Sequence, residues 1–396
     1  MKIDGIIKEN IEFLGTKELE MYFSPGRVNL IGEHIDFLGG NVFPTGISLG
    51  TYAFVTKRDD NEFHFLSENF RHKGEIVTRL NNLEYKEEDN WANYAKGMID
   101  MFVNLGYIID FGLNILIYGN LPNGAGLSSS ASLEVLIGTV LNEEFNLGVN
   151  MLDLVQYAQI VENKYIGVNC GIMDQFAVGM SKEKKAIYLN TNTLDYQYVP
   201  LILGEYTLVI ANTNKKRSLS SSKYNERRQE CDKGIKILKD NNVQFGNLCE
   251  LDINGYLKYS NLIPDKLVKN RIEHAIYEND RTIRAVEFLS NGDFINFGDL
   301  MNQSHDSLRD LYDVSCKELD VLVDSFRNHG ATGSRMTGAG FGGCTINLVK
   351  KDIVDEVIKQ VKKDYVNKVG YNADFYIVKT SNGAQRIERG DISWMY

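Results

Sequence analysis

The sequence predicts a fold that mixes helices with β-strands, of the α/β or α+β class. Strand-like and helix-like patterns alternate along the chain, which is typical of this class. The 396 residues are 43% hydrophobic and 24% charged, as expected for a globular protein. The sequence has no low-complexity tract and no repeat of fixed period, and its length suffices for two or three packed domains.

The first elements in order are two short strands, MYFS at 21–24 and RVNLIG at 27–32, separated by a Pro-Gly turn. Another strand is predicted at 111–119, FGLNILIYG. It ends just before the segment PNGAGLSSSAS at 122–132, and the helix-like run LEVLIGTVL follows directly. The serine-rich segment therefore stands between a strand and the N-terminus of a helix.

A helix is predicted over 151–166, because apolar residues recur there at helical spacing. These residues are Leu154, Ala158, Val161 and Tyr165. Asn150 is a candidate N-cap and Gly167 a candidate C-terminal stop. The helix is expected to carry Glu162.

A domain boundary is predicted near residue 200, where NTNTLDYQYVPLILGEY passes into the apolar run YTLVIANTN. We therefore expect one domain over 1–200 and a second over 201–396. In the second, the spacing of Ser315 and Glu318 matches a capping box that begins a helix, and Gly330 is placed to end it. A glycine-rich run follows and contains the spacing GxGxxG, but the strand-like CTINLV behind it argues against a dinucleotide-binding motif.

Charge and hydropathy narrow the possible partners. The formal net charge of −10 argues against nucleic acid as the main partner. No apolar stretch is long enough to cross a membrane, and MKIDGIIKENIEFLG lacks the basic start and long apolar core of a secretory signal. The five cysteines are scattered without a CxxC pair, so no disulfide framework or zinc site is predicted. We expect a cytoplasmic protein with reduced thiols and no membrane partner.

The serine-rich segment is a candidate site for an anion such as phosphate. Backbone N–H groups of residues 124–130 and the positive end of the helix dipole would converge on one spot. The glycines let the main chain approach phosphate oxygens, and the hydroxyls can donate to phosphate or ligate Mg²⁺. The alternative is a serine-capped helix after a flexible turn, and the segment alone favours neither interpretation.

Two further segments add polar side chains. SPGRVNLIGEHIDFLGG at 24–40 contains four residues that can bind hydroxyl groups, and the alternative there is a solvated loop. These residues are Arg27, Glu33, His34 and Asp36. VENKYIGVNCGIMDQF at 161–176 supplies Glu162 and Asp174. Asp174 lies among apolar and small residues, so it is predicted to be either a helix cap or a buried base.

Together with GSRMTGAGFGGCT at 333–345, these three segments resemble the signature motifs of the galactokinases, a branch of the GHMP small-molecule kinase superfamily. Supporting stretches are WANYAKG at 91–97, SSKYNERRQEC at 221–231 and MNQSHDSLRDLYDVSC at 301–316. The resemblance implies the two-domain GHMP kinase fold, α/β in each domain, with the active site in the interdomain cleft. It also implies ATP-dependent phosphorylation of D-galactose at the anomeric hydroxyl, which gives galactose 1-phosphate and ADP.

The resemblance implies roles for single residues. Asp174 matches the base that takes the proton from the anomeric hydroxyl. Arg27 matches the arginine that keeps this carboxylate ionised and stabilises charge in the transition state, which a guanidinium is suited to do. Galactose contacts are implied for Glu33, His34, Ile35, Asp36, Gly171 and Tyr224.

The resemblance also places the nucleotide and the metal. The phosphate loop is implied to consist of Gly124, Ala125, Gly126, Leu127, Ser128, Ser129 and Ser130. Ser130 and Glu162 match the Mg²⁺ ligands. Trp91 and Tyr94 match residues that flank the adenine, and Ser67 matches a further nucleotide contact. The implied partners are D-galactose and ATP with Mg²⁺, and we expect a monomer or a weak homodimer.

The sequence departs from the family pattern after Asp36. The family usually has a tyrosine where this chain has Phe37, often followed by a small polar residue where this chain has Leu38. Phe37 lacks the phenolic hydroxyl, so the sugar contacts near Asp36 are expected to differ.

Two alternative functions stay open at this point. One is an N-acetylgalactosamine kinase of the same superfamily, against which the serine-rich segment and its continuation SASLEV argue. The other is a sensor that binds galactose and ATP without turnover. The presence of Asp174, Arg27, Ser130 and Glu162 argues against the sensor.

Overall fold

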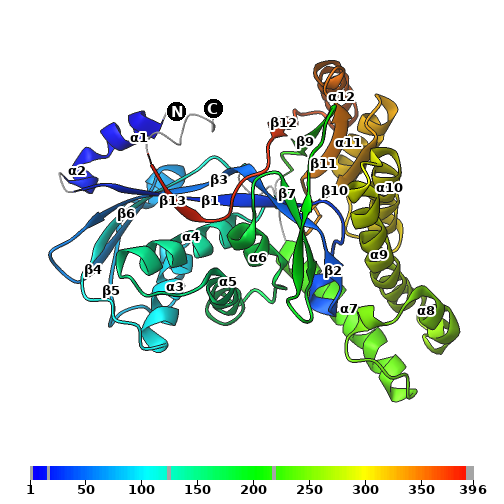
Figure 1. The fold of residues 1–396 in the computed structure, drawn as a ribbon, viewed down its shortest axis with the longest axis horizontal. Coiled ribbons are helices and arrows are strands. Elements are labelled where there is room, and N and C mark those ends of the chain that lie inside the picture. Colours follow the sequence, from blue (N-terminus) through cyan, green and yellow to red (C-terminus); the bar gives the residue numbers. More distant parts are fainter. Residues whose placement is uncertain (1–2, 16–17, 123–125, 216–219, 389–396) are drawn as a thin grey trace.

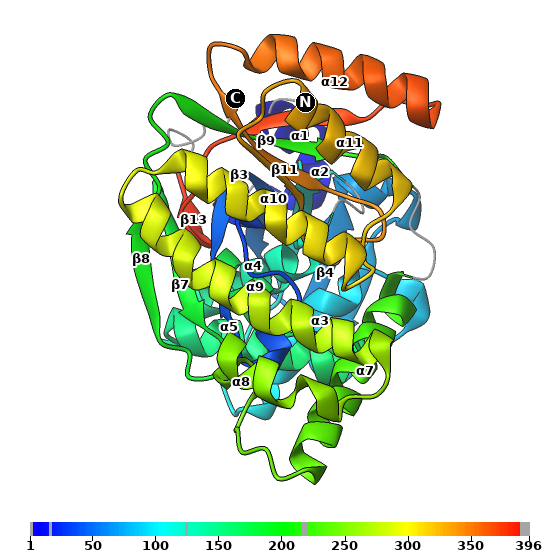
Figure 2. The ribbon, with the colours of Figure 1, turned by 90° about the vertical axis from the view of Figure 1, so that its right-hand side faces the viewer.

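The computed structural model of the chain describes residues 3–15, 18–122, 126–215 and 220–388. Figure 1 shows two parts side by side, with strands and helices in blue to green on one side and helices in yellow to orange on the other. Figure 2 looks onto the helical side. The long helices there are α9 (Lys266–Ser290), α10 (Phe294–Asp310), α11 (Lys317–Asn328) and α12 (Val354–Val369).

The first part is built on a six-stranded sheet, whose neighbours are antiparallel except for one parallel pair, β4 with β6. In sheet order its strands are β13 (Gln385–Ile387), β1 (Glu20–Asn29), β3 (Pro44–Lys57), β6 (Leu113–Gly119), β4 (Glu62–Ser67) and β5 (Ile76–Arg79). Alternate residues point to opposite faces of a strand. Accordingly Tyr22 and Ala53 belong to the main core, whereas Met21 and Phe54 belong to a smaller core on the other face.

Helices cover both faces of this sheet. The main core is shared with α3 (Ala92–Asn104), α4 (Ser129–Glu144), α5 (Met151–Ile160) and α6 (Met173–Met180). The smaller core is shared with α1 (Ile3–Glu9) and α2 (Ile11–Leu14). Strand β6 therefore leads toward α4 across the serine-rich segment, as the sequence predicted.

The sequence prediction of two strands around a Pro-Gly turn is wrong, because β1 runs through both glycine and proline as one strand. The pairing with β3 shifts at this point: Pro25 is opposite Gly50, but Gly26 is opposite Ile47. Such a bulge redirects the following side chains. It also brings β1 against the serine-rich segment, since a Cβ on Gly26 would stand 2.8 Å from the Leu127 carbonyl oxygen.

The second part is built on a four-stranded sheet with helices on both faces. In sheet order its strands are β10 (Gly333–Met336), β11 (Thr345–Lys350), β9 (Tyr206–Asn212) and β12 (Asp374–Val378). One face packs on α11 and α12, and the other packs on α9 and α10. Helices α7 (Ser220–Asp240) and α8 (Ile253–Tyr259) follow β9 and precede α9 in the chain. A third, small sheet is formed by β2 (Asn41–Val42), β7 (Lys185–Asn190) and β8 (Tyr196–Pro200).

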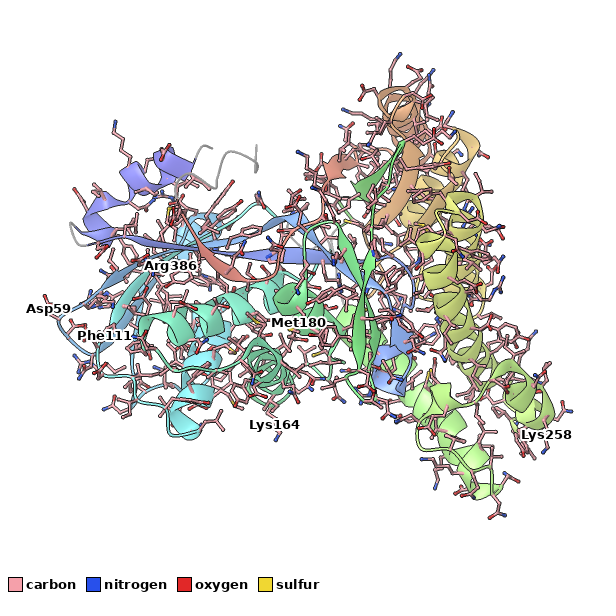
Figure 3. All side chains as sticks on the ribbon, viewed as in Figure 1. Asp59, Phe111, Lys164, Met180, Lys258 and Arg386 are labelled. Carbon is pink, nitrogen blue, oxygen red and sulfur yellow. The ribbon has the colours of Figure 1, made fainter. Side chains whose placement is uncertain are left out.

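The predicted division near residue 200 falls between β8 and β9, each of which belongs to a different sheet. The end of the chain does not follow that division, because β13 pairs with β1 in the first sheet. Figure 3 shows Arg386 of β13 in the first part, far from Lys258 on α8 in the second. Within the described ranges, no helix has both the length and the apolar character needed to span a membrane.

Two helix predictions need correction. The helix predicted over 151–166 is α5 followed by a π-helical turn, Val161–Ile166, that carries Glu162. Its predicted ends are confirmed: Asn150 accepts a hydrogen bond from the Asp153 amide, and Gly167 ends the turn with φ of 85°. The capping box at 315–318 is wrong, because α11 begins after Cys316 and Glu318 pairs with Lys215 instead.

Candidate active site

Two cavities collect nearly all of the predicted site residues. The smaller cavity has a volume of about 360 Å³, and the larger has about 620 Å³. The smaller cavity is lined by Arg27, Glu33, His34, Asp36, Glu162, Gly171, Asp174 and Tyr224, with Gly338 and Ala339 from the glycine-rich run. The larger cavity is lined by Ser67, Trp91, Tyr94, Ser129 and Ser130, among others. Gly126, Leu127 and Ser128 line neither cavity, and neither does Ile35, whose side chain is buried in the main core.

Arg27 and Asp174 form an ion pair at the wall of the smaller cavity. The bulge in β1 places Arg27 there, and the first turn of α6 presents Asp174. Nε and Nη2 of Arg27 lie 2.8 and 2.6 Å from Oδ1 of Asp174. Both contacts are to the same oxygen, so Oδ2 can accept a hydrogen bond from a ligand. Asp174 keeps 31% of its side chain exposed, which a base that meets a ligand requires.

The same arginine also holds the serine-rich segment. Its Nη1 donates to the carbonyl oxygen of Gly126 at 2.8 Å, and its backbone N–H donates to Leu127. On the other side of this segment, a Cβ on Gly338 would stand 2.5 Å from the Gly126 oxygen. The segment is therefore held between β1 and the glycine-rich run. Gly124 and Ala125, which were also predicted for the phosphate loop, lie outside the described residues.

The first serine of the row does not cap α4. Ser128 adopts a left-handed conformation with φ of 62°, and its side chain makes no capping hydrogen bond. Its hydroxyl oxygen is buried without a partner among the described residues. Ser129 is exposed, and Ser130 lies at intermediate exposure on the wall of the larger cavity. This arrangement argues against the interpretation of the row as a serine-capped helix.

Glu33 and His34 reach the smaller cavity from a loop after β1. Arg335 of β10 donates to Oε2 of Glu33 at 2.9 Å, although burial raises the pKa of this glutamate. His34 donates from Nε2 to the carbonyl oxygen of Ala339 at 3.2 Å. Burial lowers the pKa of His34 to about 3, so the ring is neutral. Its Nδ1 is then an acceptor, and it has no partner among the described residues.

Asp36 and Gly171 are in close contact across the same cavity. A Cβ on Gly171 would stand 1.9 Å from Oδ2 of Asp36, so this position has no room for a side chain. Burial raises the pKa of Asp36 to about 6, and the negative charge of Asp174 adds to this effect. Asp36 is thus a carboxyl group poised between two protonation states at the edge of a small polar cavity.

Tyr224 of α7 closes the cavity from the second part. Its ring lies 5.5 Å from the ring of His34 and 5.7 Å, edge to face, from the ring of Phe37. The guanidinium of Arg228, one turn further along α7, lies over Phe37 at 5.4 Å. Phe37 does not line the smaller cavity but a separate one behind Asp36 and Gly171. The departure from the family pattern therefore lies behind the site.

Glu162 lies in an excess of buried negative charge. Burial and the negative charge of Asp174 raise its pKa, hydrogen bonds from Ser130 and other neighbours lower it, and the result is a pKa of about 7. The side-chain amide of Gln175 donates to Glu162 and, at 3.3 Å, to Glu134, a second fully buried glutamate. Burial and the charge of Glu162 raise the pKa of Glu134. A cation at this place would relieve the repulsion.

Several residues of the site were not predicted from the sequence. Arg335 belongs to a quoted motif, but nothing in the motif shows that it reaches Glu33. Gln175 follows Asp174 in the sequence, but the sequence does not show that it bonds to Glu134 and Glu162. Glu134 belongs to the quoted stretch SASLEV, but nothing in that stretch shows that Glu134 lies beside Glu162. Glu278 lies on a helix without a motif, and only its complete burial marks it. Three-dimensional packing decides these roles.

Comparison with known proteins relates the sequence to one enzyme family. Residues 11–57 match the galactokinase galactose-binding signature, residues 93–182 the N-terminal domain of the GHMP kinases and residues 285–367 their C-terminal domain. The chain is 51% identical over 386 residues to the galactokinase of Clostridium beijerinckii, covering 97% of this chain and 99% of that protein. It is 50% identical over 388 residues to the galactokinase of Fusobacterium nucleatum, covering 98% and 100%.

Solved structures give the same result for the fold. The Lactococcus lactis galactokinase in complex with galactose superimposes with a TM-score of 0.94 at 46% identity, covering 97% of this chain and all of that chain. A mevalonate kinase superimposes with a TM-score of 0.66 at 18% identity, covering 92% of this chain and all of that chain. The second likeness concerns the fold alone.

Proposed function

The chain belongs to the galactokinase family and is an ATP-dependent sugar kinase, and we propose how its residues carry out the reaction. The reaction transfers the terminal phosphoryl group of ATP to the anomeric oxygen of D-galactose, giving galactose 1-phosphate and ADP. The observation that carries the proposal is the Arg27–Asp174 pair on the wall of the smaller cavity. Phosphoryl transfer needs an aligned nucleophile and positive charge near the phosphates.

Asp174 acts as the base. Its free Oδ2 accepts the proton of the anomeric hydroxyl while the oxygen forms its bond to the γ-phosphorus, and the bond from that phosphorus to the β-phosphate oxygen breaks. Arg27 holds the carboxylate in place through two contacts to Oδ1, at 2.6 and 2.8 Å, which leave Oδ2 directed to the sugar hydroxyl in the proposal. Arg27 also touches the serine-rich segment, so it is placed to stabilise charge that develops on the phosphoryl group.

The smaller cavity binds the sugar. Glu33, Asp36, Tyr224 and the acceptor Nδ1 of His34 surround it with polar groups, and each sugar hydroxyl needs such a partner. Because Gly171 has no side chain, there is room for the Asp36 carboxylate next to it. The side chain of Ile35 fills the core behind this loop, so we assign it a packing role.

The larger cavity binds the nucleotide. Trp91 and Tyr94 supply aromatic surface for the adenine, and Ser67 supplies a hydroxyl. The phosphates would extend toward the N-terminus of α4, where backbone N–H groups and the helix dipole favour anions. Gly124 to Ser130 form this loop in the proposal. Ser129 and Ser130, which line the larger cavity, connect the two ends of the nucleotide site.

Ser130 and Glu162 would hold Mg²⁺. Among the described residues, no three His, Cys, Asp or Glu side chains cluster so as to hold a metal ion, but Mg²⁺ in kinases usually takes one or two protein oxygens together with phosphate oxygens. The oxygen donors fit, and a cation would offset both effects that raise the pKa of Glu162, namely its burial and the negative charge of Asp174. When bound there, the metal would supply positive charge that offsets the charge of the phosphates.

We also propose that the chain acts in the cytoplasm as a monomer or weak homodimer, independently of nucleic acid and membranes. The net charge of −10 and the five unpatterned cysteines support this proposal. Sedimentation velocity at several concentrations measures the oligomeric state. We also propose that one domain covers residues 1–200 and the second covers 201–396, except that β13 near the end of the chain pairs with β1 of the first part.

The test of the function is an ADP-release assay with purified protein, ATP and Mg²⁺ across galactose, N-acetylgalactosamine, glucose and no sugar. We expect turnover with galactose, with galactose 1-phosphate identified as the product by NMR. Equal turnover with N-acetylgalactosamine would favour the alternative kinase. Binding of galactose and ATP without any sugar phosphate would contradict the proposed mechanism.

A further inference from the structure

The loop that carries Glu33 and His34 has a strained backbone. Gly32 has φ of 97°, and His34, which is not glycine, has φ of 61°. The left-handed region costs a residue such as histidine on the order of 1 kcal/mol or more, so it persists only where the surroundings hold it. A Cβ on Gly32 would stand 2.8 Å from the Asn41 carbonyl oxygen. The loop is thus confined on the side of β2.

Glu278 of α9 holds the other side of this loop. Its Oε1 accepts the backbone N–H groups of Gly32 at 3.0 Å and Glu33 at 3.2 Å. Ser304 of α10 donates to the same oxygen at 2.6 Å, and Arg281 donates to Oε2 at 2.8 Å. One fully buried carboxylate therefore joins two helices of the second part to two successive amides of the sugar-binding loop.

His274 of α9 continues this contact one helical turn earlier. A carbonyl can only accept, so Nε2 of His274 donates to the Glu33 carbonyl oxygen at 3.1 Å. Its Nδ1 then accepts from the Ser307 hydroxyl at 2.8 Å. Residues four apart lie on the same face of a helix. Glu278 therefore accepts from the N–H of Glu33 while His274 donates to the carbonyl oxygen of the same residue.

Glu278 is ionised although burial disfavours its charge. Burial opposes ionisation, but Arg281, His274 and Arg335 outweigh it and lower the pKa of Glu278 to about 2. Buried ion pairs contribute little to stability compared with apolar residues of the same volume. A carboxylate with four hydrogen bonds in this position therefore needs an explanation other than stability, and the strained loop that it binds supplies one.

We propose that Glu278, assisted by His274, is a positioning residue that holds the loop 32–34 of one part from a helix of the other and so sets the affinity for the sugar. The proposal rests on the proposed function of the smaller cavity. Glu278 does not line that cavity, so it acts through Glu33 and His34. It follows that the sugar site is complete only when the two parts are docked as described.

Three substitutions test this proposal. Glu278→Gln keeps the size of the side chain but leaves it one acceptor oxygen, so its NH2 group meets either the loop N–H groups or the guanidinium of Arg281. His274→Asn is too short to reach the Glu33 carbonyl and removes a single hydrogen bond from the loop. Glu273→Gln is the matched control, because Glu273 lies on the same helix but accepts from Tyr256 of α8. For each variant, KM for galactose, KM for ATP, kcat and the thermal unfolding temperature are measured.

We expect KM for galactose to rise about tenfold or more in Glu278→Gln and about threefold or more in His274→Asn, as the loss of hydrogen bonds to buried groups implies. KM for ATP should stay within about twofold, and Glu273→Gln should change neither constant. A purely structural role would move both KM values together with the unfolding temperature, and that result would overturn the proposal.

An unchanged galactose KM in a folded Glu278→Gln variant would overturn it as well. If Glu278→Gln does not fold, His274→Asn decides between the same two outcomes. Calorimetric titration with galactose separates this inference from the proposed function. A wild-type protein that binds galactose without phosphorylating it would contradict the mechanism, whereas a loss of affinity confined to the Glu278 and His274 variants would still support the role of Glu278.

Discussion

Gly171 and Asp36 are so close that a methyl group on Gly171 would stand 1.9 Å from Oδ2 of Asp36. This contact joins the loop before α6 to the short helical turn after β1, and both lie on the wall of the smaller cavity. The absence of a side chain at residue 171 therefore determines where the Asp36 carboxylate stands.

Gly171→Ala is expected to weaken galactose use without removing catalysis. The new methyl group must displace the carboxylate of Asp36, because no real Cβ tolerates such a distance. We expect KM for galactose to rise about tenfold or more, as for a misplaced hydrogen-bonding group. KM for ATP, measured in the same preparations, is the internal control, and an unchanged galactose KM would contradict the contact.

Asp174→Asn is expected to lower kcat by roughly 10²-fold or more, the range for loss of a general base. The substitution keeps the shape of the side chain but removes the proton acceptor. Galactose affinity, measured by calorimetry, should change far less than kcat. A variant that retains kcat within a few-fold of the wild type would show that Asp174 orients the hydroxyl without accepting its proton.

Ser130→Ala and Glu162→Gln are each expected to raise the Mg²⁺ concentration needed for half-maximal activity by about tenfold or more. Both remove an oxygen that the proposal assigns to the metal. Ser129→Ala is the control, because Ser129 is the exposed neighbour in the same turn, and its Mg²⁺ titration should match the wild type. Wild-type titrations in both test variants would place the metal elsewhere.

Phe37→Tyr is expected to change KM for galactose by only a few-fold, because Phe37 packs behind the site against Tyr224 and Arg228. Asp36→Asn should nearly abolish galactose use, since a site built to bind a hydroxyl discriminates strongly when its partner is lost. Phe37→Tyr thus reports on the departure from the family pattern, and Asp36→Asn reports on the contact between the carboxylate and the sugar. Normal galactose kinetics in Asp36→Asn would refute the assignment.

The pKa of Asp36 predicts a pH dependence of sugar binding. It is raised from its ordinary value to about 6 by burial and by Asp174, so the carboxylate predominates above that pH and the neutral acid below it. If the carboxylate accepts a sugar hydroxyl, galactose affinity is constant near neutral pH and falls as the pH drops through about 6, approaching about tenfold per pH unit. Calorimetry without nucleotide or Mg²⁺ measures this dependence independently of catalysis. The same titration in Glu162→Gln removes the contribution of Glu162, whose pKa of about 7 lies in the same range.

A galactose affinity that stays constant between about pH 5 and about pH 8, in protein that remains folded, would contradict this prediction. Circular dichroism at each pH provides that control. Phe37→Tyr should show the same pH dependence as the wild type, because it leaves Asp36 in place.

The sequence determined most of the local structure and the set of candidate residues. The strand at 111–119, the N-cap Asn150 and the helix after the serine-rich segment follow from patterns within a few residues of one another. The polar side chains of the three motifs are likewise visible in the sequence. Local patterns predict these features because propensity, capping and periodicity act over one or two turns of the chain.

Only the tertiary structure decided which of these residues meet. Arg27 and Asp174 are 147 positions apart, and the bulge that directs Arg27 toward the cavity interrupts what the sequence presented as two strands and a turn. The ion pair of Glu33 spans 302 positions to Arg335, and Glu278 reaches the same loop from a helix without any motif. Such contacts depend on how the sheets and helices pack across the whole chain, and burial then sets the charge of each group. The sequence therefore determined the chemical groups of the site, whereas packing determined their partners and protonation.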